Sequence, residues 1–374
     1  MSMNFSNNLR NNSDDISLSI LVLTYNHEKF IQQCLLSIKS IVFPSWHIWV
    51  LDDGSTDQTP EIVRRFAAEN TGITLVTQKN SGGSTSRNLQ RLLDVSRGRY
   101  VMFMSGDDML GPGFPVQSFY DRFQQHPNIG LILPRVVVLD SNPTKRTEAI
   151  YTQDMIKLFN SGDPNCVFDK YLNKRVSSIF IQGMMIERNL LERIGGFDID
   201  LTADDYALVC KLFSNMPALE KKFYFFQEAF WIYRIHDSNI HKNALRQIKI
   251  ITEVVGRYIK KKNWALFDWH IMPLKEAKDI FEAEFIFLSN IDEEISKKIL
   301  KKIITKTYAC WIESGDFIEI KKSILGMQAS TLGRWCAIYC LIKSLPVALI
   351  GLVLRVPIVS NALRVLSLAA QRRI

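Results

Sequence analysis

The sequence predicts an α/β fold in which a largely parallel sheet carries helices on both faces. In the first hundred residues, short apolar runs typical of buried strands alternate four times with segments whose apolar residues recur with the helical period. The connections between these segments are short, and strands joined through helices in this way lie parallel in one sheet. Right-handed crossovers then give a doubly wound sheet of the kind that binds nucleotides.

The elements of this sheet can be assigned in order. The predicted strands are residues 17–24, 47–51, 73–77 and 100–104, each rich in apolar or β-branched side chains. Three helices between them are indicated by apolar residues that share one helical face. These residues are Ile31, Cys34, Leu35 and Ile38 in the first helix, Ile62, Val63 and Phe66 in the second, and Leu89, Leu92 and Leu93 in the third.

The chain divides into three predicted parts. Residues 1–16 are a polar tail without the basic start and apolar core of a signal peptide. Residues 17–243 form the α/β domain, in which the pattern beyond residue 110 loosens into longer loops and two aromatic strands at 223–226 and 230–233. Residues 244–374 form a helical, Lys-rich region that ends in apolar runs interleaved with basic residues.

The composition limits the class of protein. With 374 residues, 47% hydrophobic and 22% charged, the chain has ample apolar surface to bury, which excludes a disordered protein. Its six cysteines show no Cys-x-x-Cys spacing. Buried, reduced thiols in a cytosolic protein therefore fit better than a disulfide scaffold or a structural zinc site.

The net charge of +8 is concentrated at the C-terminus. Residues 320–374 contain eight basic residues and no acidic one, and the other 319 residues carry 38 of each sign. Nucleic-acid binding is disfavoured because the folded part has no excess charge to neutralise phosphates. Bases between apolar runs favour helices that lie on an anionic membrane surface. The uncharged run 344–354 has 11 residues, fewer than the about 20 that a spanning helix needs; a spanning helix and a dimer interface are the alternatives.

Polar residues follow the predicted strands at the sheet edge where ligands of such folds bind. Asp107 and Asp108 are adjacent carboxylates after a buried strand, and they repel each other unless a cation neutralises them. Their hard oxygen atoms suit Mg²⁺ or Mn²⁺, which can also hold a diphosphate. An acidic surface turn is the structural alternative.

Two further segments point to a nucleotide. Asp52 and Asp53 precede a helix; capping would explain one acidic residue, and the second favours contact with a base or ribose. Residues 80–86 form a Gly-rich loop that opens a helix and places Arg87 in its first turn, near a bound anion. The loop lacks both the dinucleotide fingerprint and the P-loop lysine, which argues against an NAD-dependent enzyme.

From residue 17 to about residue 239, the chain resembles an inverting family 2 glycosyltransferase of the GT-A fold, a Rossmann-like mixed sheet with helices on both faces. Seven motifs in one order carry the resemblance. They are Val22-Leu23-Thr24-Tyr25-Asn26, Leu51-Asp52-Asp53-Gly54-Ser55-Thr56-Asp57, Arg87-Asn88, Phe103-Met104-Ser105-Gly106-Asp107-Asp108, Ile194-Gly195-Gly196-Phe197-Asp198, Asp204-Asp205-Tyr206-Ala207-Leu208 and Tyr233-Arg234-Ile235-His236-Asp237-Ser238-Asn239.

The resemblance implies a role for each matching residue. The family's Asp-x-Asp motif reads Ser105-Gly106-Asp107 here, so the first carboxylate is missing and Asp107 takes the metal role, with His236 as a second ligand. Asp205 corresponds to the family's catalytic base, although an acidic residue in the first turn of a helix is also common for structural reasons. The residues implied in nucleotide-sugar binding are Thr24, Tyr25, Asn26, Asp53, Arg87, Asp108 and Arg234.

The expected activity is metal-dependent, inverting transfer of one sugar from a nucleotide diphosphate sugar, UDP-linked as is common in similar enzymes. The expected acceptor is a hydroxyl of a lipid-linked glycan in bacterial O-antigen or capsule synthesis, at the cytoplasmic face of the inner membrane. The leaving diphosphate needs cationic neutralisation, and a placed base contributes roughly 10²–10⁴ in rate. The alternative is a catalytically silent scaffold, against which Asp107, Asp205 and His236 argue.

Overall fold

The computed structural model describes residues 17–140, 148–149, 151–173, 179–236, 243–266, 273–316, 318–319 and 322. The chain divides into two compact units, residues 1–239 and 240–374, and each is described by itself. The predicted N-terminal tail and the apolar, basic C-terminal tail lie outside the described residues.

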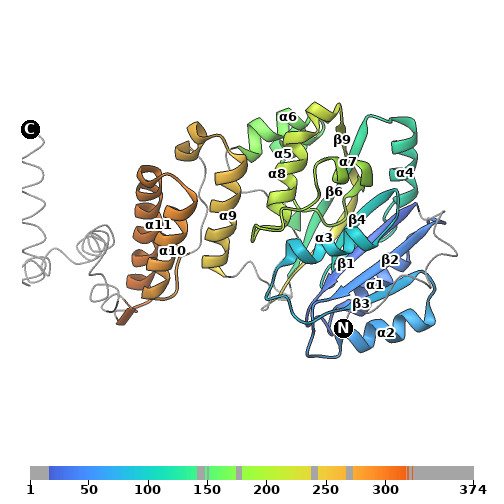
Figure 1. Cartoon of the computed structure of the whole chain (residues 1–374), viewed down its shortest axis with the longest axis horizontal. Helices are drawn as coiled ribbons and strands as arrows, with labels where there is room; N and C mark the ends of the chain where they lie inside the picture. The colour runs from blue at the N-terminus through green and yellow to red at the C-terminus, as the bar shows by residue number, and fades with distance from the viewer. Residues whose placement is uncertain are drawn as a thin grey trace, which may run out of the picture. The chain divides into compact units, whose positions relative to one another are not determined.

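The first unit contains a mixed sheet flanked by helices (Figure 1). Its strands are β1 (Leu18–Thr24), β2 (Trp46–Asp52), β3 (Ile73–Thr77), β4 (Tyr100–Ser105), β5 (Met109–Leu110), β6 (Ile129–Asp140), β7 (Glu148–Ala149), β8 (Met185–Glu187) and β9 (Lys222–Ile235). The order is β3-β2-β1-β4-β8-β6-β9-β5, and β7 pairs with β6. Strands β3, β2, β1 and β4 are parallel, whereas β8 is antiparallel to both of its neighbours.

The helical segments of this unit connect or follow these strands. They are α1 (Ile31–Lys39), α2 (Thr59–Glu69), α3 (Thr85–Val95), α4 (Val116–Gln125), α5 (Gln153–Phe159), α6 (Pro164–Val167), η1 (Phe168–Leu172), α7 (Arg188–Arg193), α8 (Asp205–Asn215) and η2 (Pro217–Leu219). The chain moves outward from β1 to β3 and then returns past β1 to β4. With right-handed crossovers, α1 and α2 cover one face and α3 covers the other, which confirms the predicted fold class.

The predicted core of the sheet is confirmed. Leu18, Ile20, Leu21 and Val22 of β1 are all fully buried, as expected for a central strand with helices on both faces. Helix α1 buries the four residues predicted from their spacing. In α2, Val63 and Phe66 are buried while Ile62 is only half-buried, at the edge of the packed face. Of the described cysteines, Cys34 and Cys210 are buried, as predicted, whereas Cys166 and Cys310 are half-buried.

The aromatic region differs from the prediction. The two strands expected at 223–226 and 230–233 are one strand, β9, which pairs in parallel with β6. The register shifts where Pro134 pairs with Phe226 and Arg135 pairs with Phe230. Residues 227–229 therefore bulge out of the ladder. In the sequence, the polar residues Gln227 and Glu228 resemble a turn between two strands. In the structure, a bulge accommodates the extra residues, and the strand continues in the same direction.

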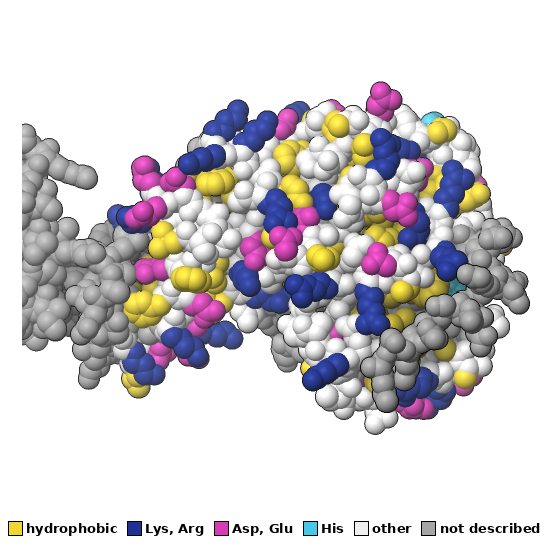
Figure 2. Space-filling view, in the orientation of Figure 1, with side chains coloured by type: hydrophobic (Ala, Val, Ile, Leu, Met, Phe, Trp, Pro, Cys, Tyr) yellow, Lys and Arg dark blue, Asp and Glu magenta, His cyan; other side chains and the backbone are white. Residues whose placement is uncertain are grey.

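The second unit contains α9 (Ala244–Tyr258), a 3₁₀ segment η4 (Lys261–Leu266), α10 (Ala277–Asn290) and α11 (Glu293–Glu313). The described residues between 244 and 313 are thus largely helical, as predicted. Trp311 is buried and donates from Nε1 to the Leu274 carbonyl at 3.1 Å. Among the described residues, no helix has the length and hydropathy needed to cross a bilayer. On the face that Figure 2 shows, Lys and Arg side chains are interspersed with Asp and Glu.

Candidate active site

The candidate site lies where the strand order reverses, at the carboxyl ends of β1 and β4. Leu23 pairs with Ser105 across these two strands, and the Gly106 N–H donates to the Leu23 carbonyl at 2.9 Å. The chain leaves β1 toward β2 on one side, while β4 lies on the other side. In open α/β sheets this point opens a crevice for ligands. The turn after β1, with Thr24, and the turn after β4, with Asp107, meet there.

Asp107 and His236 are brought together although 129 residues separate them in the sequence. Nε2 of His236 lies 3.1 Å from Oδ2 of Asp107, and Ser105 Oγ donates to Oδ1 of the same carboxylate. The antiparallel pairing of β5 with β9 places the end of β9 beside the residues that follow β4. Burial opposes ionisation of Asp107, but the hydrogen bond with His236 and the nearby His27 outweigh it and lower its pKa to about 2. Asp107 is therefore a fixed negative charge.

His27 and Phe30 complete this cluster, and neither was predicted from the sequence. His27 Nε2 lies 3.7 Å from Asp107 Oδ2, and burial lowers the pKa of His27 against the attraction of Asp107. The Phe30 ring stacks on the His236 ring with centroids 4.7 Å apart. His27 directly follows the Thr-Tyr-Asn segment, but its position in a turn gave no signal of its own. Phe30 fixes the plane of His236 and so directs Nε2 toward Asp107.

Asp108 and Arg234 interact through the backbone of β9. The N–H of Arg234 donates to Asp108 Oδ1 at 3.0 Å. Burial and the charge of Asp107 raise the pKa of Asp108 well above its ordinary value. The Arg234 guanidinium donates to Gln33 Oε1 and lies over the Phe30 ring, 5.2 Å from its centroid. Asp108 and Arg234 therefore both lie beside Asp107, and each already forms a hydrogen bond within the protein.

The segments predicted to bind the nucleotide base are tied together by hydrogen bonds. Asp53 is 5% exposed, and its carboxylate accepts from Gln78 Nε2 at 2.6 Å, the Ser81 N–H at 2.9 Å and Ser81 Oγ at 2.7 Å. Asn26 has a left-handed backbone with φ of 54°, and its Oδ1 accepts from the Thr56 N–H at 2.8 Å. These bonds join the turn after β1, the turn after β2 and the Gly-rich loop into one surface.

Two predicted residues of this surface differ in exposure. Thr24 is buried, and Tyr25 is 44% exposed at the mouth of the crevice. A third, Arg87, is exposed, and its Nε donates to the Ile199 carbonyl at 3.1 Å. Arg87 therefore contacts the loop that leads to Asp205.

Asp205 is the first residue of α8 and follows the N-cap residue Asp204. Desolvation and the charge of Asp204 raise the pKa of Asp205 well above its ordinary value, against a hydrogen bond from Gln182. Its charge also raises the pKa of Asp108 and of Tyr233, so the three groups belong to one electrostatic cluster. A carboxyl group with a raised pKa at the edge of this cluster can accept a proton near neutral pH.

The loop before Asp205 is held by α3. Ser86 Oγ donates to the Ala203 carbonyl at 2.7 Å, and the Phe197 N–H donates to Gln90 Oε1 at 2.8 Å. On the other side of this loop, Lys211 of α8 forms an ion pair with Asp198 at 2.8 Å. The Gly-Gly-Phe-Asp motif thus connects the loop to both α3 and α8, and these contacts fix the position at which α8 begins.

The structure brings together Asp107 and His236, the two residues that the sequence predicts as metal ligands. Within the described residues, no group of three or more His, Cys, Asp or Glu side chains is arranged to hold a metal ion. Two protein ligands suit a divalent cation that takes its other ligands from phosphates and water. Because one of the two is an imidazole, the set favours Mn²⁺ over Mg²⁺.

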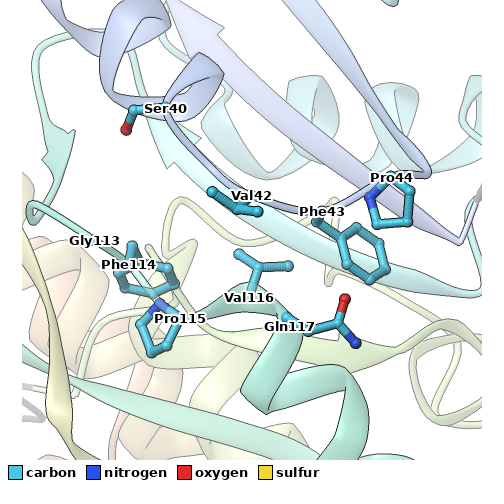
Figure 3. Close-up of a pocket in the computed structure, with 9 residues that line it drawn as sticks. All are labelled: Ser40, Val42, Phe43, Pro44, Gly113, Phe114, Pro115, Val116 and Gln117. Carbon is cyan, nitrogen blue, oxygen red and sulfur yellow. The ribbon is translucent and has the colours of Figure 1, made fainter.

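A separate apolar cavity of about 520 Å³ lies between the loop after α1 and the segment that leads into α4. Val42, Phe43, Phe114 and Val116 are among the side chains that line it (Figure 3). None of the predicted site residues lines this cavity.

The comparison with known proteins identifies a glycosyltransferase domain within the chain. Residues 19–195 match the model of glycosyl transferase family 2. The glycosyltransferase GlyA of Streptococcus pneumoniae is 31% identical over 112 residues, which cover 30% of this chain and 16% of that protein. The poly-beta-1,6-N-acetyl-D-glucosamine synthase of Staphylococcus epidermidis is 22% identical over 196 residues, 52% of this chain and 45% of that protein. The chain thus matches less than half the length of these relatives.

Two solved structures align with most of the chain at low sequence identity. TarS of S. aureus in complex with UDP-GlcNAc aligns with a TM-score of 0.47 and 17% identity, over 88% of this chain and 80% of that one. The mannosyltransferase PcManGT from Pyrobaculum calidifontis, in complex with GDP-Man and Mn²⁺, aligns with a TM-score of 0.48 and 18% identity, over 87% and 86%. Residues 19–195 thus form a glycosyl transferase family 2 domain, which is built on the mixed sheet described above.

Proposed function

We propose that the protein transfers one sugar from a nucleotide diphosphate sugar, UDP-linked, to a hydroxyl of a lipid-linked glycan, with inversion and with the help of Mn²⁺ or Mg²⁺. The observation that carries the proposal is the contact between Asp107 and His236 at the switch point of the sheet, with Asp205 in the same electrostatic cluster. The site thus combines a place for a cation with a carboxyl group of raised pKa. Inverting transfer needs both groups.

The leaving group is the nucleoside diphosphate. Asp107 and His236 are the residues that would hold the metal ion, which neutralises the charge on the departing phosphate when bound. Arg234 lies beside them and adds a positive charge: Asp108 holds its backbone N–H, and Gln33 accepts a hydrogen bond from its guanidinium. The nucleotide base lies against Asp53, Thr24 and Tyr25 in this proposal, which requires Asp53 to exchange a hydrogen bond now made with Gln78 or Ser81.

The acceptor reacts on the side of Asp205. Its hydroxyl oxygen forms the new bond to the anomeric carbon as the bond from that carbon to the phosphate oxygen breaks, and its proton passes to the Asp205 carboxylate. A raised pKa makes this carboxylate a stronger base than an ordinary aspartate at neutral pH. A single displacement of this kind inverts the anomeric configuration.

The setting that we propose is the assembly of a bacterial surface polysaccharide such as O-antigen or capsule. Similar proteins include synthases of poly-beta-1,6-N-acetyl-D-glucosamine and of chondroitin. The basic, apolar tail would attach the enzyme to the cytoplasmic face of the inner membrane, where lipid-linked acceptors are found. A dimer interface is the alternative use of the same tail.

A donor screen tests the proposal. The full-length protein is incubated with UDP-, GDP- and TDP-sugars and with lipid extracts as acceptor, and nucleotide release is measured with Mn²⁺, with Mg²⁺ and with excess chelator. We expect release that needs a divalent cation and that is lost in Asp205→Asn. No release from any donor by a folded protein would favour the scaffold alternative.

A further inference from the structure

Gln182 lies in a short segment that two strands hold in place. Its backbone forms an isolated parallel bridge with Phe103 of β4, and the Gly183 N–H donates to the Phe103 carbonyl at 3.0 Å. Gly183 has a φ of +72°, and a Cβ at this position would lie 3.1 Å from the Trp231 ring of β9. The backbone that carries Gln182 is therefore fixed between the two strands that lead into the acidic site.

The carboxamide of Gln182 faces the carboxyl group of Asp205. Its Nε2 lies 3.5 Å from Asp205 Oδ1. The NH₂ group of the amide is thus the part turned toward Asp205, and this orientation favours the ionised form, because an ionised carboxylate only accepts hydrogen bonds. The Oε1 atom of Gln182 then points elsewhere, and it is buried without a hydrogen-bond partner among the described residues. Buried acceptors nearly always have a donor, so this atom calls for one.

The other groups around Asp205 cannot orient it in the same way. The charged and titratable groups that face it are Asp204 at the N-cap of α8, Asp108 after β4, and Tyr233 of β9. The two aspartates repel its charge and favour the protonated form. The amide of Gln182 is the hydrogen-bond donor that the structure places at its side chain, within the described residues.

Aromatic side chains from the segment that carries Gln182 and from β9 pack against one another. Phe180 stacks on Tyr233 with centroids 5.4 Å apart and lies edge-on to Trp231 at 5.6 Å. Phe180 and Tyr233 are half-buried, so part of each ring faces solvent. Exposed aromatic surface beside a few convergent polar groups is typical of a pocket for a small polar ligand such as a sugar ring.

We propose that Gln182 positions Asp205 and selects the acceptor sugar: Nε2 orients the carboxylate, and Oε1 accepts a hydrogen bond from the acceptor hydroxyl next to the one that attacks. This inference rests on the proposed function, in which Asp205 takes the proton from the acceptor. Gln182 itself forms no bond to the reacting atoms and is a positioning residue.

The experiment uses the full-length protein and two kinds of readout. Gln182→Met removes both hydrogen-bonding atoms at similar volume, and Gln182→Glu adds a carboxylate. Gln117→Met is the matched control, since Gln117 Nε2 donates to Asp121 at 2.8 Å on the surface of α4. The pKa of Asp205 is measured by carboxyl-carbon NMR on protein with ¹³C-labelled aspartate, and Asp205→Asn assigns the signal. Kinetics use the donor identified in the donor screen with a panel of methyl glycosides as acceptors, and then the monodeoxy analogues of the glycoside that reacts fastest.

We expect the pKa of Asp205 to rise in Gln182→Met, because the charged form loses its donor, and to rise further in Gln182→Glu. The acid limb of the pH profile of kcat/KM should move to higher pH with it. The acceptor KM should increase about tenfold, the size of one lost hydrogen bond, while the donor KM changes less than about twofold. One monodeoxy analogue that is poor for the wild type should be used by Gln182→Met as well as the parent acceptor.

Several results would overturn the inference. An unchanged pKa of Asp205 in folded Gln182→Met would remove the positioning role, and an unchanged acceptor KM would remove the binding role. If Gln182→Met fails to fold, an unchanged pKa of Asp205 in Gln182→Glu would likewise remove the positioning role. Full turnover by Asp205→Asn would instead contradict the proposed function, and the NMR readout then shows separately whether Gln182 sets the charge of Asp205.

Discussion

The Thr24 hydroxyl lies so close to Gly106 that a Cβ on this glycine would be 2.7 Å from Thr24 Oγ1. The same Cβ would be 3.0 Å from Nδ1 of His27. Both polar atoms are buried without a hydrogen-bond partner among the described residues. The absence of a side chain at the middle position of Ser105-Gly106-Asp107 therefore lets the turns after β1 and β4 close on each other.

Gly106→Ala should destabilise the protein by about 1–3 kcal/mol, because the added methyl group overpacks this contact. Nucleotide binding should weaken as well, since Thr24 and His27 must move apart. Thermal unfolding and titration with UDP measure the two effects. The double variant Gly106→Ala/Thr24→Ala should recover part of the lost stability. If Gly106→Ala is as stable as the wild type, the turns after β1 and β4 can move apart without loss of stability, which would contradict the close contact with Thr24 and His27.

Asp107→Ala should abolish metal-dependent transfer and leave the fold intact. It removes the carboxylate that His236 and Ser105 contact, and with it the anionic ligand for the cation. Mn²⁺ binding, followed by its electron paramagnetic resonance signal, should be lost together with activity. Undiminished activity of this variant, or of the wild type in excess chelator, would rule out the metal role of Asp107.

Asp205→Asn should lower turnover by at least about 10², the usual contribution of a placed base. Donor affinity should survive, because the carboxylate faces the acceptor rather than the nucleotide. Initial rates and calorimetric titration with the donor separate these two quantities. A loss of donor affinity with little loss of turnover would assign Asp205 to binding instead.

The same substitution should make the protein more stable at neutral pH. The pKa of Asp205 is raised in the folded state, so the folded protein holds this proton at pH values where the unfolded chain has released it. The contribution of this bound proton to the free energy of unfolding is present at low pH and is lost as the pH rises through the pKa of Asp205 in the folded protein. The difference in melting temperature between Asp205→Asn and wild type should therefore grow from pH 4 to pH 8. A difference that shrinks over this range would contradict the raised pKa.

The C-terminal tail should attach the protein to membranes through its charge. Anionic headgroups contribute on the order of 1 kcal/mol for each nearby base, so high salt should release part of the protein from anionic liposomes. Truncation after Ser330 should abolish this binding and retain binding of the nucleotide sugar. A full-length protein that never binds anionic liposomes would favour the dimer interface.

The parallel half of the fold could be predicted because its signals are local. In β1 and α1 the apolar spacing directly reflects which residues face the core, and the buried residues of α1 match the predicted set. The site residues at the ends of β1, β2 and β4 follow from the same rule, since parallel strands end at one edge.

What could not be predicted depends on contacts between distant segments. His236 meets Asp107 across 129 residues, through a pairing of β5 with β9 that a two-residue strand does not reveal in the sequence. The role of His27 likewise depends on where Asp107 lies, and that of Gln182 on a bridge to Phe103. None of these residues belongs to a periodic pattern: the family resemblance indicates a role for His236, whereas the roles of His27 and Gln182 follow only from the folded backbone.

The bulge at residues 227–229 has a consequence for which changes of chain length the protein tolerates. Because these residues are already outside the ladder with β6, one more or one fewer there leaves both flanking registers in place. Between Phe230 and His236 the situation is the opposite: side chains alternate along β9, so a single deletion would turn every later residue to the other face of the sheet. His236 would then point away from Asp107. Natural insertions and deletions in related chains should therefore collect at the bulge and avoid the six residues that follow Phe230.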